Sequence, residues 1–160
     1  MSPRAASRLE TLGFGEVHDY VGSKMDWIGD GLPFEGTLSD RPRLSTLADA
    51  EVPTFRLGDT VGDVRDRLGG WDLGLVLAGP EPVVLGLVRP EALPADDHRR
   101  VEDVMEHGPS TYRPHVTAEE MSPRLHDDPA PWVIVTTLSG HLVGVARPEA
   151  IHAAARSDSG

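Results

Sequence analysis

Two apolar stretches of the chain have nearly the same sequence. Residues 83–93 read VVLGLVRPEAL, and residues 141–151 read HLVGVARPEAI. Their glycines, Gly86 and Gly144, lie 58 positions apart. Each string predicts an apolar strand that leads into a helix, because proline suits the first helical position and a neighbouring glutamate favours the positive helix end. The chain therefore contains one small unit that is repeated once.

The stretches between these strings also correspond, at an offset of 57 residues. Extended segments at 53–56 and 110–113 each precede a threonine with an acid three positions later, which is the spacing of a helix capping box. The two capping pairs are Thr60 with Asp63 and Thr117 with Glu120. The helices that follow have matching apolar faces, made by Val61, Val64 and Leu68 in the first copy and by Ala118, Met121 and Leu125 in the second.

Apolar strands at 73–78 and 132–136 complete the correspondence, and each copy is predicted to run β-α-β-β-α. Two prolines modify this pattern. We expect Pro123 to shorten or kink the second capped helix, and Pro94 to end the first RPEA helix early. The second RPEA helix is expected to continue to about Arg156.

Residues 1–36 follow a different pattern. Ala5, Ala6, Leu9 and Leu12 recur at helical spacing before Gly13. The segment resembles the C-terminal part of a rhodanese domain, and the positions that carry this resemblance are Gly13, Phe14, Val17, Tyr20-Val21-Gly22, Trp27 and Gly31-Leu32-Pro33. The catalytic cysteine of that family is missing, so we expect a non-catalytic fragment. We expect its apolar residues to pack on the repeated part of the chain, on a second protomer, or on both. The polar residues 37–43 are interpreted as a linker.

Composition restricts the function further. The chain has 160 residues, a net charge of −11 and no cysteine. An acidic protein is poorly suited to nucleic acid, whose phosphates require a basic surface. The absence of cysteine excludes disulfides, thiolate metal sites and thiol catalysis, and therefore sulfur transfer of the rhodanese type. No stretch has the apolar length of a membrane span, and we expect a cytoplasmic protein without a membrane partner.

The repeated part, residues 44–156, resembles a tandem pair of CBS domains. VEDVMEHGPSTYRP is similar to the usual opening of a second CBS repeat, and GHLVGVARPEA to its closing strand and helix. The resemblance implies an α+β fold of two repeats, 44–97 and 98–156, related by a pseudo-two-fold axis with two clefts between the sheets. Residues 157–160 are expected to be a disordered tail.

The same resemblance implies where a ligand would bind. Ligand-binding CBS pairs hold AMP, ATP or another adenosyl compound, with a Ser/Thr and an Asp after the last strand of each repeat. Here Arg89 and Arg147 replace the hydroxyl residue, and Ala92 and Ala150 replace the acid. We therefore expect an anion held by arginine and a helix N-terminus, with weak, salt-sensitive binding and poor recognition of ribose. The alternative is that each RPEA is a helix start with its arginine in solvent.

Other candidate residues are less specific. Thr54, Arg56, Thr111 and Arg113 fall where the first strand of a CBS repeat contacts its ligand, and they are equally well interpreted as ordinary strand residues. Trp71 and Trp132 are expected in core or rim packing rather than under a base. The histidines show no ligand spacing, and we expect no metal site.

The sequence thus favours a non-catalytic, regulatory CBS pair with a small anionic ligand. The alternative is a ligand-free dimerisation scaffold. In both cases we expect a homodimer through the CBS helices. The face expected in that dimer carries Val61, Val64, Leu68, Met121 and Leu125.

Overall fold

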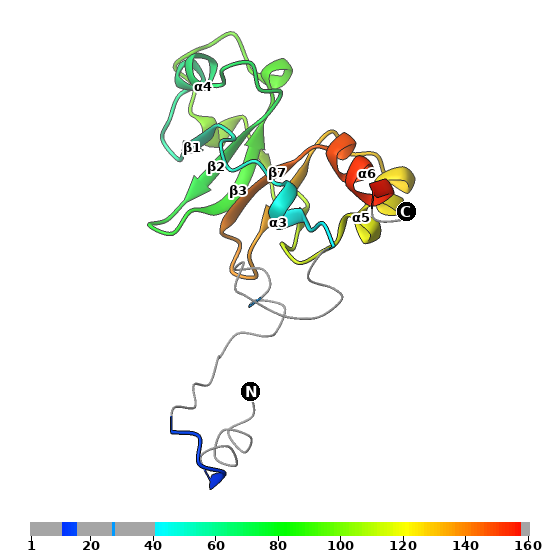
Figure 1. Cartoon of the computed structure of the whole chain (residues 1–160). Coiled ribbons are helices and arrows are strands. Elements are labelled where there is room, and N and C mark those ends of the chain that lie inside the picture. Colours follow the sequence, from blue (N-terminus) through cyan, green and yellow to red (C-terminus); the bar gives the residue numbers. More distant parts are fainter. Residues whose placement is uncertain (1–10, 16–26, 28–40, 158–160) are drawn as a thin grey trace.

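The computed structural model describes residues 11–15, residue 27 and residues 41–157 (Figure 1). Most of the predicted rhodanese-like segment (1–36) and of the linker (37–43), and residues 158–160 of the expected tail, lie outside the described residues. The described elements follow the predicted order of two repeats. They are α3 (Leu44–Leu47), β1 (Thr54–Arg56), α4 (Val61–Arg67), β2 (Gly74–Ala78), β3 (Val83–Val88), the 3-10 turns η1 (Pro90–Ala92) and η2 (Val101–Asp103), β4 (Glu106–His107), β5 (Thr111–Tyr112), α5 (Ala118–Asp127), β6 (Val133–Thr136), β7 (Leu142–Ala146) and α6 (Pro148–Ser157).

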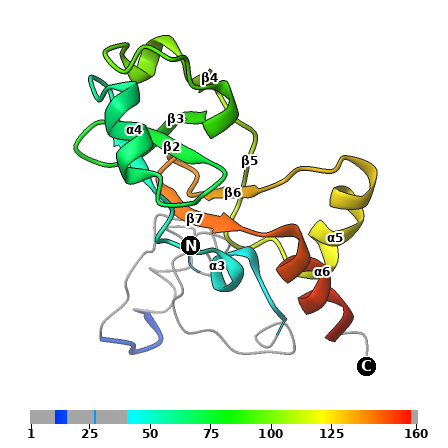
Figure 2. The same ribbon diagram turned by 90° about the horizontal axis from the view of Figure 1, so that it is seen from above.

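The strands form two sheets, one for each repeat. The first has the order β1-β2-β3-β4 and the second the order β5-β6-β7. In both sheets the first pair is parallel and the hairpin after it is antiparallel. Helix α4 lies at one end of the molecule, and α5 and α6 lie together at the other (Figures 1 and 2). The predicted α+β fold of two related units is confirmed.

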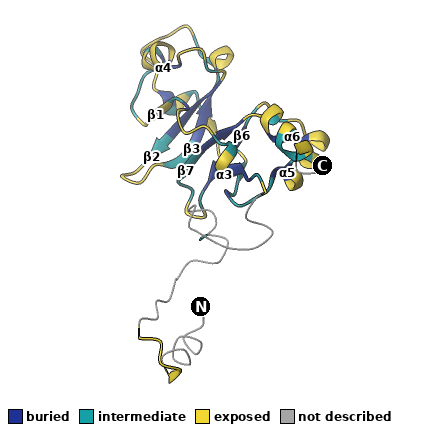
Figure 3. Cartoon of the chain, viewed as in Figure 1, coloured by how far each residue is buried: buried dark blue, intermediate teal, exposed yellow. Residues whose placement is uncertain are grey.

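Three apolar clusters hold these layers together. One lies between the two sheets and includes Leu75 and Ile134. A second lies under α4 around Phe55, and a third lies under α5 and α6 around Met121. The buried positions are concentrated on the strands and on the inner sides of the helices, as Figure 3 shows.

The first segment of each repeat packs in the core of the other repeat, an arrangement called here the exchange of first segments. Leu44, before the first strand of repeat 1, is fully buried in the cluster under α5 and α6 of repeat 2. Val101, at the start of repeat 2, is fully buried in the cluster under α4 of repeat 1. Corresponding main-chain hydrogen bonds secure both crossings: Leu44 N–H to Val116 O (2.9 Å), Ala118 N–H to Pro42 O (2.8 Å), Val101 N–H to Asp59 O (2.9 Å) and Val61 N–H to Arg99 O (2.9 Å). Such reciprocal contacts are what a pseudo-two-fold relation requires.

The repeated glycines have a packing role in these crossings. A Cβ at Gly86 would lie 2.7 Å from the carbonyl oxygen of Glu106, where β4 crosses β3. A Cβ at Gly144 would lie 2.7 Å from the carbonyl oxygen of Asp49, where the segment after α3 crosses β7. Glycine is needed because another backbone approaches too closely for a side chain.

Both predicted capping boxes are present. The Thr60 N–H and hydroxyl donate to Asp63 Oδ2, and those of Thr117 donate to Glu120 Oε2, at 2.8–3.0 Å. The backbone hydrogen bond, and then the hydroxyl, lower the pKa of each carboxyl from its ordinary value, 3.8 for Asp63 and 4.5 for Glu120. Each of these carboxyls has a lower pKa in the folded protein than in the unfolded chain, so its ionised form stabilises the fold. This stabilisation is fully present at pH values above the unfolded pKa and is lost as the pH falls through the folded pKa.

Thr117→Ala is therefore expected to lower the free energy of unfolding by about 1 kcal/mol at neutral pH. The loss should shrink below the ordinary glutamic acid pKa of 4.5, because protonated Glu120 no longer accepts these hydrogen bonds as a carboxylate. Urea denaturation across the acid range measures this. Ser45→Ala is the control, because Ser45 lies outside the Thr60–Asp63 and Thr117–Glu120 capping boxes. Any change that it causes in the free energy of unfolding should be independent of pH. If the loss of stability in Thr117→Ala did not change with pH, the ionisation of Glu120 would not be linked to this capping box.

One predicted helix differs from expectation, and another ends early as predicted. Helix α5 has 10 residues, so the prediction that Pro123 would shorten it is wrong. Pro123 lies on the exposed side, where water can bond the carbonyl that proline leaves without a donor. In repeat 1 the RPEA sequence makes only the turn η1, because Pro94 favours extended backbone at Leu93 (φ −73°, ψ 126°). Strand β4 was not predicted.

The predicted dimer face is corrected by this packing. Val61, Val64 and Met121 are 0% exposed, Leu125 is 4% and Leu68 is 6% exposed. All five residues are covered within the single chain, because each belongs to or supports the core under its own helix. A second copy therefore cannot bury this face.

Candidate functional site

A cavity of about 650 Å³ lies between the two repeats. Its size falls within the range of ordinary small-molecule sites. Leu73, Leu87 and Ile134 supply its buried apolar part. The polar and rim residues come from the ends of strands and the connections beside them: Asp72, Arg89, Glu91, Glu106, Ser110, Trp132, Arg147 and Glu149.

Corresponding residues of the two repeats face this one cavity. Arg89 follows β3 and Arg147 follows β7, and both line it. Glu91 and Glu149, two positions further on, line it as well. The CBS resemblance implied two clefts, whereas both arginines line this one cavity. The pseudo-two-fold relation brings the ends of β3 and β7 to the same place, which periodicity along the sequence does not reveal.

Each arginine is held against a neighbour. Arg89 Nε lies 3.2 Å from Glu106 Oε1 in a partly exposed ion pair. The guanidinium of Arg147 lies 4.6 Å from the ring centroid of Trp132, in cation–π geometry. Trp132 in turn packs on Trp71, with ring centroids 5.4 Å apart. The prediction of rim packing for the tryptophans is confirmed, and Trp132 also lines the cavity.

The charge of the lining differs from the expectation of a positive patch. Four carboxylates, those of Asp72, Glu91, Glu106 and Glu149, face the cavity beside two guanidinium groups. Glu149 also occupies the first turn of α6, where it already interacts with the positive helix end. In repeat 1, η1 is a single turn and provides no helix dipole of this kind. The cavity therefore offers two arginines within an acidic rim.

Solved structures identify the architecture, although no family model and no curated protein match the chain. The cytosolic domain of the Mg2+ channel MgtE in complex with ATP has a TM-score of 0.60 at 20% identity, over 71% of this chain and 50% of that one. The cystathionine beta-synthase pair domain of a putative Mg2+ transporter from Shewanella oneidensis MR-1 has a TM-score of 0.65 at 14% identity, over 99% of this chain and 89% of that one. CBSX2 in complex with AMP has a TM-score of 0.62 at 15% identity, over 74% of this chain and 99% of that one.

The chain has the fold of a CBS-domain pair. It spans 50% of the MgtE domain and 51% of the soluble part of another magnesium transporter, which matches with a TM-score of 0.64. Among the described residues, no helix has the length and apolar character needed to cross a membrane. The same residues contain no group of three or more His, Cys, Asp or Glu side chains placed to hold a metal ion.

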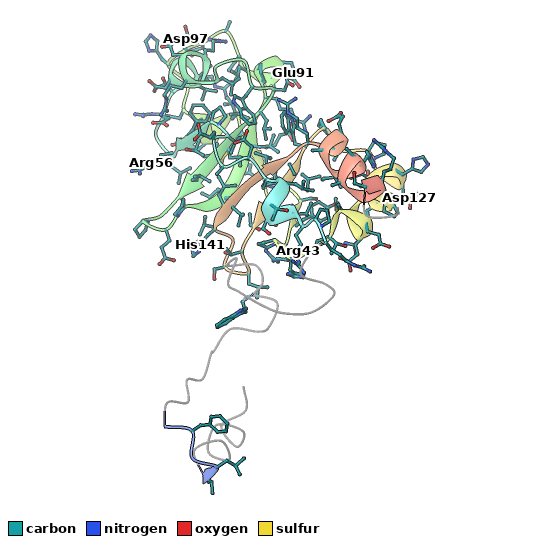
Figure 4. The ribbon with its side chains drawn as sticks, viewed as in Figure 1. Arg43, Arg56, Glu91, Asp97, Asp127 and His141 are labelled. Carbon is teal, nitrogen blue, oxygen red and sulfur yellow. The ribbon has the colours of Figure 1, made fainter. Side chains whose placement is uncertain are left out.

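The first-strand residues predicted from the CBS resemblance do not line this cavity. Thr54 and Arg56 are exposed on β1, on either side of buried Phe55. In Figure 4, Arg56 extends from the outer edge of the first sheet, far from Glu91 at the cavity. Thr111 pairs with Ile134 in the second sheet. These positions are strand residues in the described structure.

Arg113 has a structural role in the CBS pair. Its Nη1 donates to Thr136 Oγ1 at 3.1 Å and to the Thr137 carbonyl oxygen at 2.5 Å, so the guanidinium supports the end of β6. Ala92 and Ala150 are exposed on η1 and α6 and do not line the cavity. Of the eight predicted site residues, Arg89 and Arg147 line this cavity, and the other six do not.

The site residues that sequence reasoning missed are mainly acidic. Glu91 and Glu149 stand in the repeated RPEA string, but their repetition was explained by the helix start alone. Asp72 corresponds to Pro129 and has no acidic counterpart in repeat 2. Glu106 corresponds to Asp49 at the offset of 57, but it belongs to the unpredicted strand β4. A search for acids close to the repeated arginines would have found the two glutamates and not the other two.

Proposed function

We propose that this CBS pair is a non-catalytic regulatory module and that the cavity between its repeats binds a small adenosyl compound. The observation that carries the proposal is the convergence of Arg89 and Arg147 with Trp132 on one cavity of about 650 Å³. Support comes from the structural neighbours, since the MgtE cytosolic domain and CBSX2 are complexes with ATP and AMP.

The charges of the cavity favour a ligand with few phosphates. Two guanidinium groups can grip one phosphate through charge-assisted hydrogen bonds. Each further phosphate meets the acidic rim, where Asp72, Glu91 and Glu149 form no ion pair with any described residue. A ligand such as AMP therefore gains from the arginines with less repulsion than ATP. Repulsion between close like charges is the reason for this order.

Calorimetry with AMP, ATP, GMP and adenosine tests the proposal, with Trp132 fluorescence as a second readout. We expect AMP to bind more tightly than ATP, and Arg147→Ala to weaken AMP binding by about ten- to hundredfold, since a charge-assisted hydrogen bond contributes about 1.5–3 kcal/mol. Arg56→Ala is the matched control, because Arg56 is exposed on β1 away from the cavity. Failure of all four compounds to bind, or equal loss in the control, would refute the assignment.

The scaffold alternative makes the opposite prediction. A ligand-free CBS pair would bind none of these compounds and would act by self-association, for which a two-fold dimer is the commonest form. Since the five predicted interface residues are buried, such a dimer would use other surfaces, such as the exposed sides of α4, α5 and α6. Light scattering of the full chain, with and without AMP, separates this scaffold from a ligand-binding module.

A further inference from the structure

The two repeats differ most in their last helix. In repeat 2, α6 packs against α5 and contributes Ile151, Ala154 and Ala155 to the core. In repeat 1, the corresponding segment makes only η1 and then turns away after Leu93. Among the described helices, α4 therefore covers the core of repeat 1 by itself, whereas both α5 and α6 cover the core of repeat 2.

A groove of about 450 Å³ marks this difference. Leu68, Trp71, Leu93 and Pro90 provide its apolar surface, and Arg65 and Asp72 provide charges at its edge. Leu68 corresponds to Leu125 of α5, which belongs to the same buried cluster as Ile151 of α6. The groove thus lies on the side of α4 that corresponds to the side of α5 covered by α6.

The N-terminal segment has the composition of the missing helix. Residues 2–12 read SPRAASRLETL, with a proline at the start and with Ala5, Ala6, Leu9 and Leu12 at helical spacing. Helix α6 likewise begins with proline and packs through alanines and one larger aliphatic residue. Leu12 is 62% exposed and Phe14 is 59% exposed, so this segment ends in apolar side chains that lack cover.

Charge and reach also suit this occupant. The segment carries Arg4 and Arg8 against one acid, Glu10. The groove edge offers the carboxylate of Asp72, while the guanidinium of Arg65 is already paired with Asp97. The chain between Phe14 and Leu44 can extend by about 3.3–3.6 Å per residue, which far exceeds the width of a domain of this size. The segment can therefore reach the groove of its own chain.

We propose that residues 2–12 dock as a helix, ended by Gly13, in this groove of the same chain and complete repeat 1. The apolar residues of the segment cover the half-buried Trp71 and Leu93, beside Leu68, which is already buried. Trp71 also contacts Trp132, which lines the cavity between the repeats. Asp72 lines both this cavity and the groove. The docked segment would therefore lie against the wall of the cavity.

Because the chain has no cysteine, a single engineered pair tests this directly. In the full-length protein, Leu12→Cys is combined with Arg65→Cys at the groove edge, and the control combines Leu12→Cys with Arg124→Cys on the exposed side of α5. We expect an intramolecular disulfide at least tenfold faster in the groove pair than in the control, followed by mass spectrometry. Equal rates in the two pairs would overturn the proposal, and a disulfide that forms mainly between two chains would overturn docking within one chain.

A second measurement does not depend on disulfide geometry. Leu9→Asp should lower the thermal midpoint of the full chain and increase hydrogen exchange at Leu68 and Leu93, since charge in the segment would expel it from the groove. Leu138→Asp is the control, because Leu138 is 63% exposed in the β6–β7 turn. Unchanged exchange at the groove after Leu9→Asp would contradict docking even if the variant is less stable.

Discussion

Leu44→Ala is expected to lower the free energy of unfolding by about 2–5 kcal/mol, the usual cost of deleting a buried leucine side chain. Leu44 is 0% exposed and packs with Met121, Val133 and Ile151. The cavity left behind would lie in the core of repeat 2, although Leu44 precedes repeat 1 in the sequence. Refilling that space would require α3 to move, and its main-chain bond to Val116 opposes this.

Urea denaturation measures this loss, and Leu57→Ala is the matched control. Leu57 is 48% exposed, so the same substitution there should change stability by at most about 0.5 kcal/mol. Hydrogen exchange should show that Leu44→Ala loosens α5 and α6 before α4. A loss confined to repeat 1 would contradict the exchange of first segments.

The exchange also predicts how the repeats fold. A fragment that begins at residue 98 would lack Leu44 and the bonds from the segment at 42–44 to the start of α5. It would expose the cluster under α5 and α6, so we expect it to be unfolded or aggregated when produced alone. We therefore expect the two repeats to fold as one unit, which circular dichroism of the fragment and of the full chain measures.

Local signals in the sequence predicted the starts of the two capped helices and the early end of the first RPEA helix correctly. The capping pairs Thr60–Asp63 and Thr117–Glu120 act within one helical turn, and the structure contains both. The early end at Pro94 was also predictable, since proline restricts the residue before it. Such features depend only on near neighbours in the chain.

Features that depend on which segments meet in space were not predictable from the repeat. The apolar face of Leu44 indicated burial but not the partner repeat. In the same way, Arg89 and Arg147 were recognised as equivalent, while their convergence on one cavity and the acids around them depend on the relation between the two sheets. Periodicity in one dimension contains no information about that relation.

The two repeats also fill their cores differently, and this difference is visible at Gly74. Its position in β2 corresponds to buried Val133 in β6, whereas Phe55 of repeat 1 corresponds to Tyr112 of repeat 2. A Cβ at Gly74 would lie 2.3 Å from Cε2 of Phe55 and 3.1 Å from Cδ1 of Leu68. The phenyl ring thus occupies the volume that a side chain on the strand fills in repeat 2.

Gly74→Ala is expected to destabilise the protein by about 1–3 kcal/mol, as overpacking of a full core does. Phe55 cannot easily move aside, because it is 1% exposed and the Arg67 guanidinium lies 4.8 Å from its ring centroid. Gly62→Ala is the control: its Cβ would lie 3.4 Å or more from its neighbours inside α4, so alanine should stabilise the helix by about 0.5–1 kcal/mol.

The double variant Gly74→Ala with Phe55→Leu decides whether the phenyl ring is the cause. Leucine is smaller, so it should leave room for the added methyl group. The loss in the double variant should then be less than the sum of the two single losses by about 0.5–3 kcal/mol, the range of coupling between residues in contact. Additive losses by chemical denaturation would mean that Gly74 is required for the backbone of β2 rather than for the ring of Phe55.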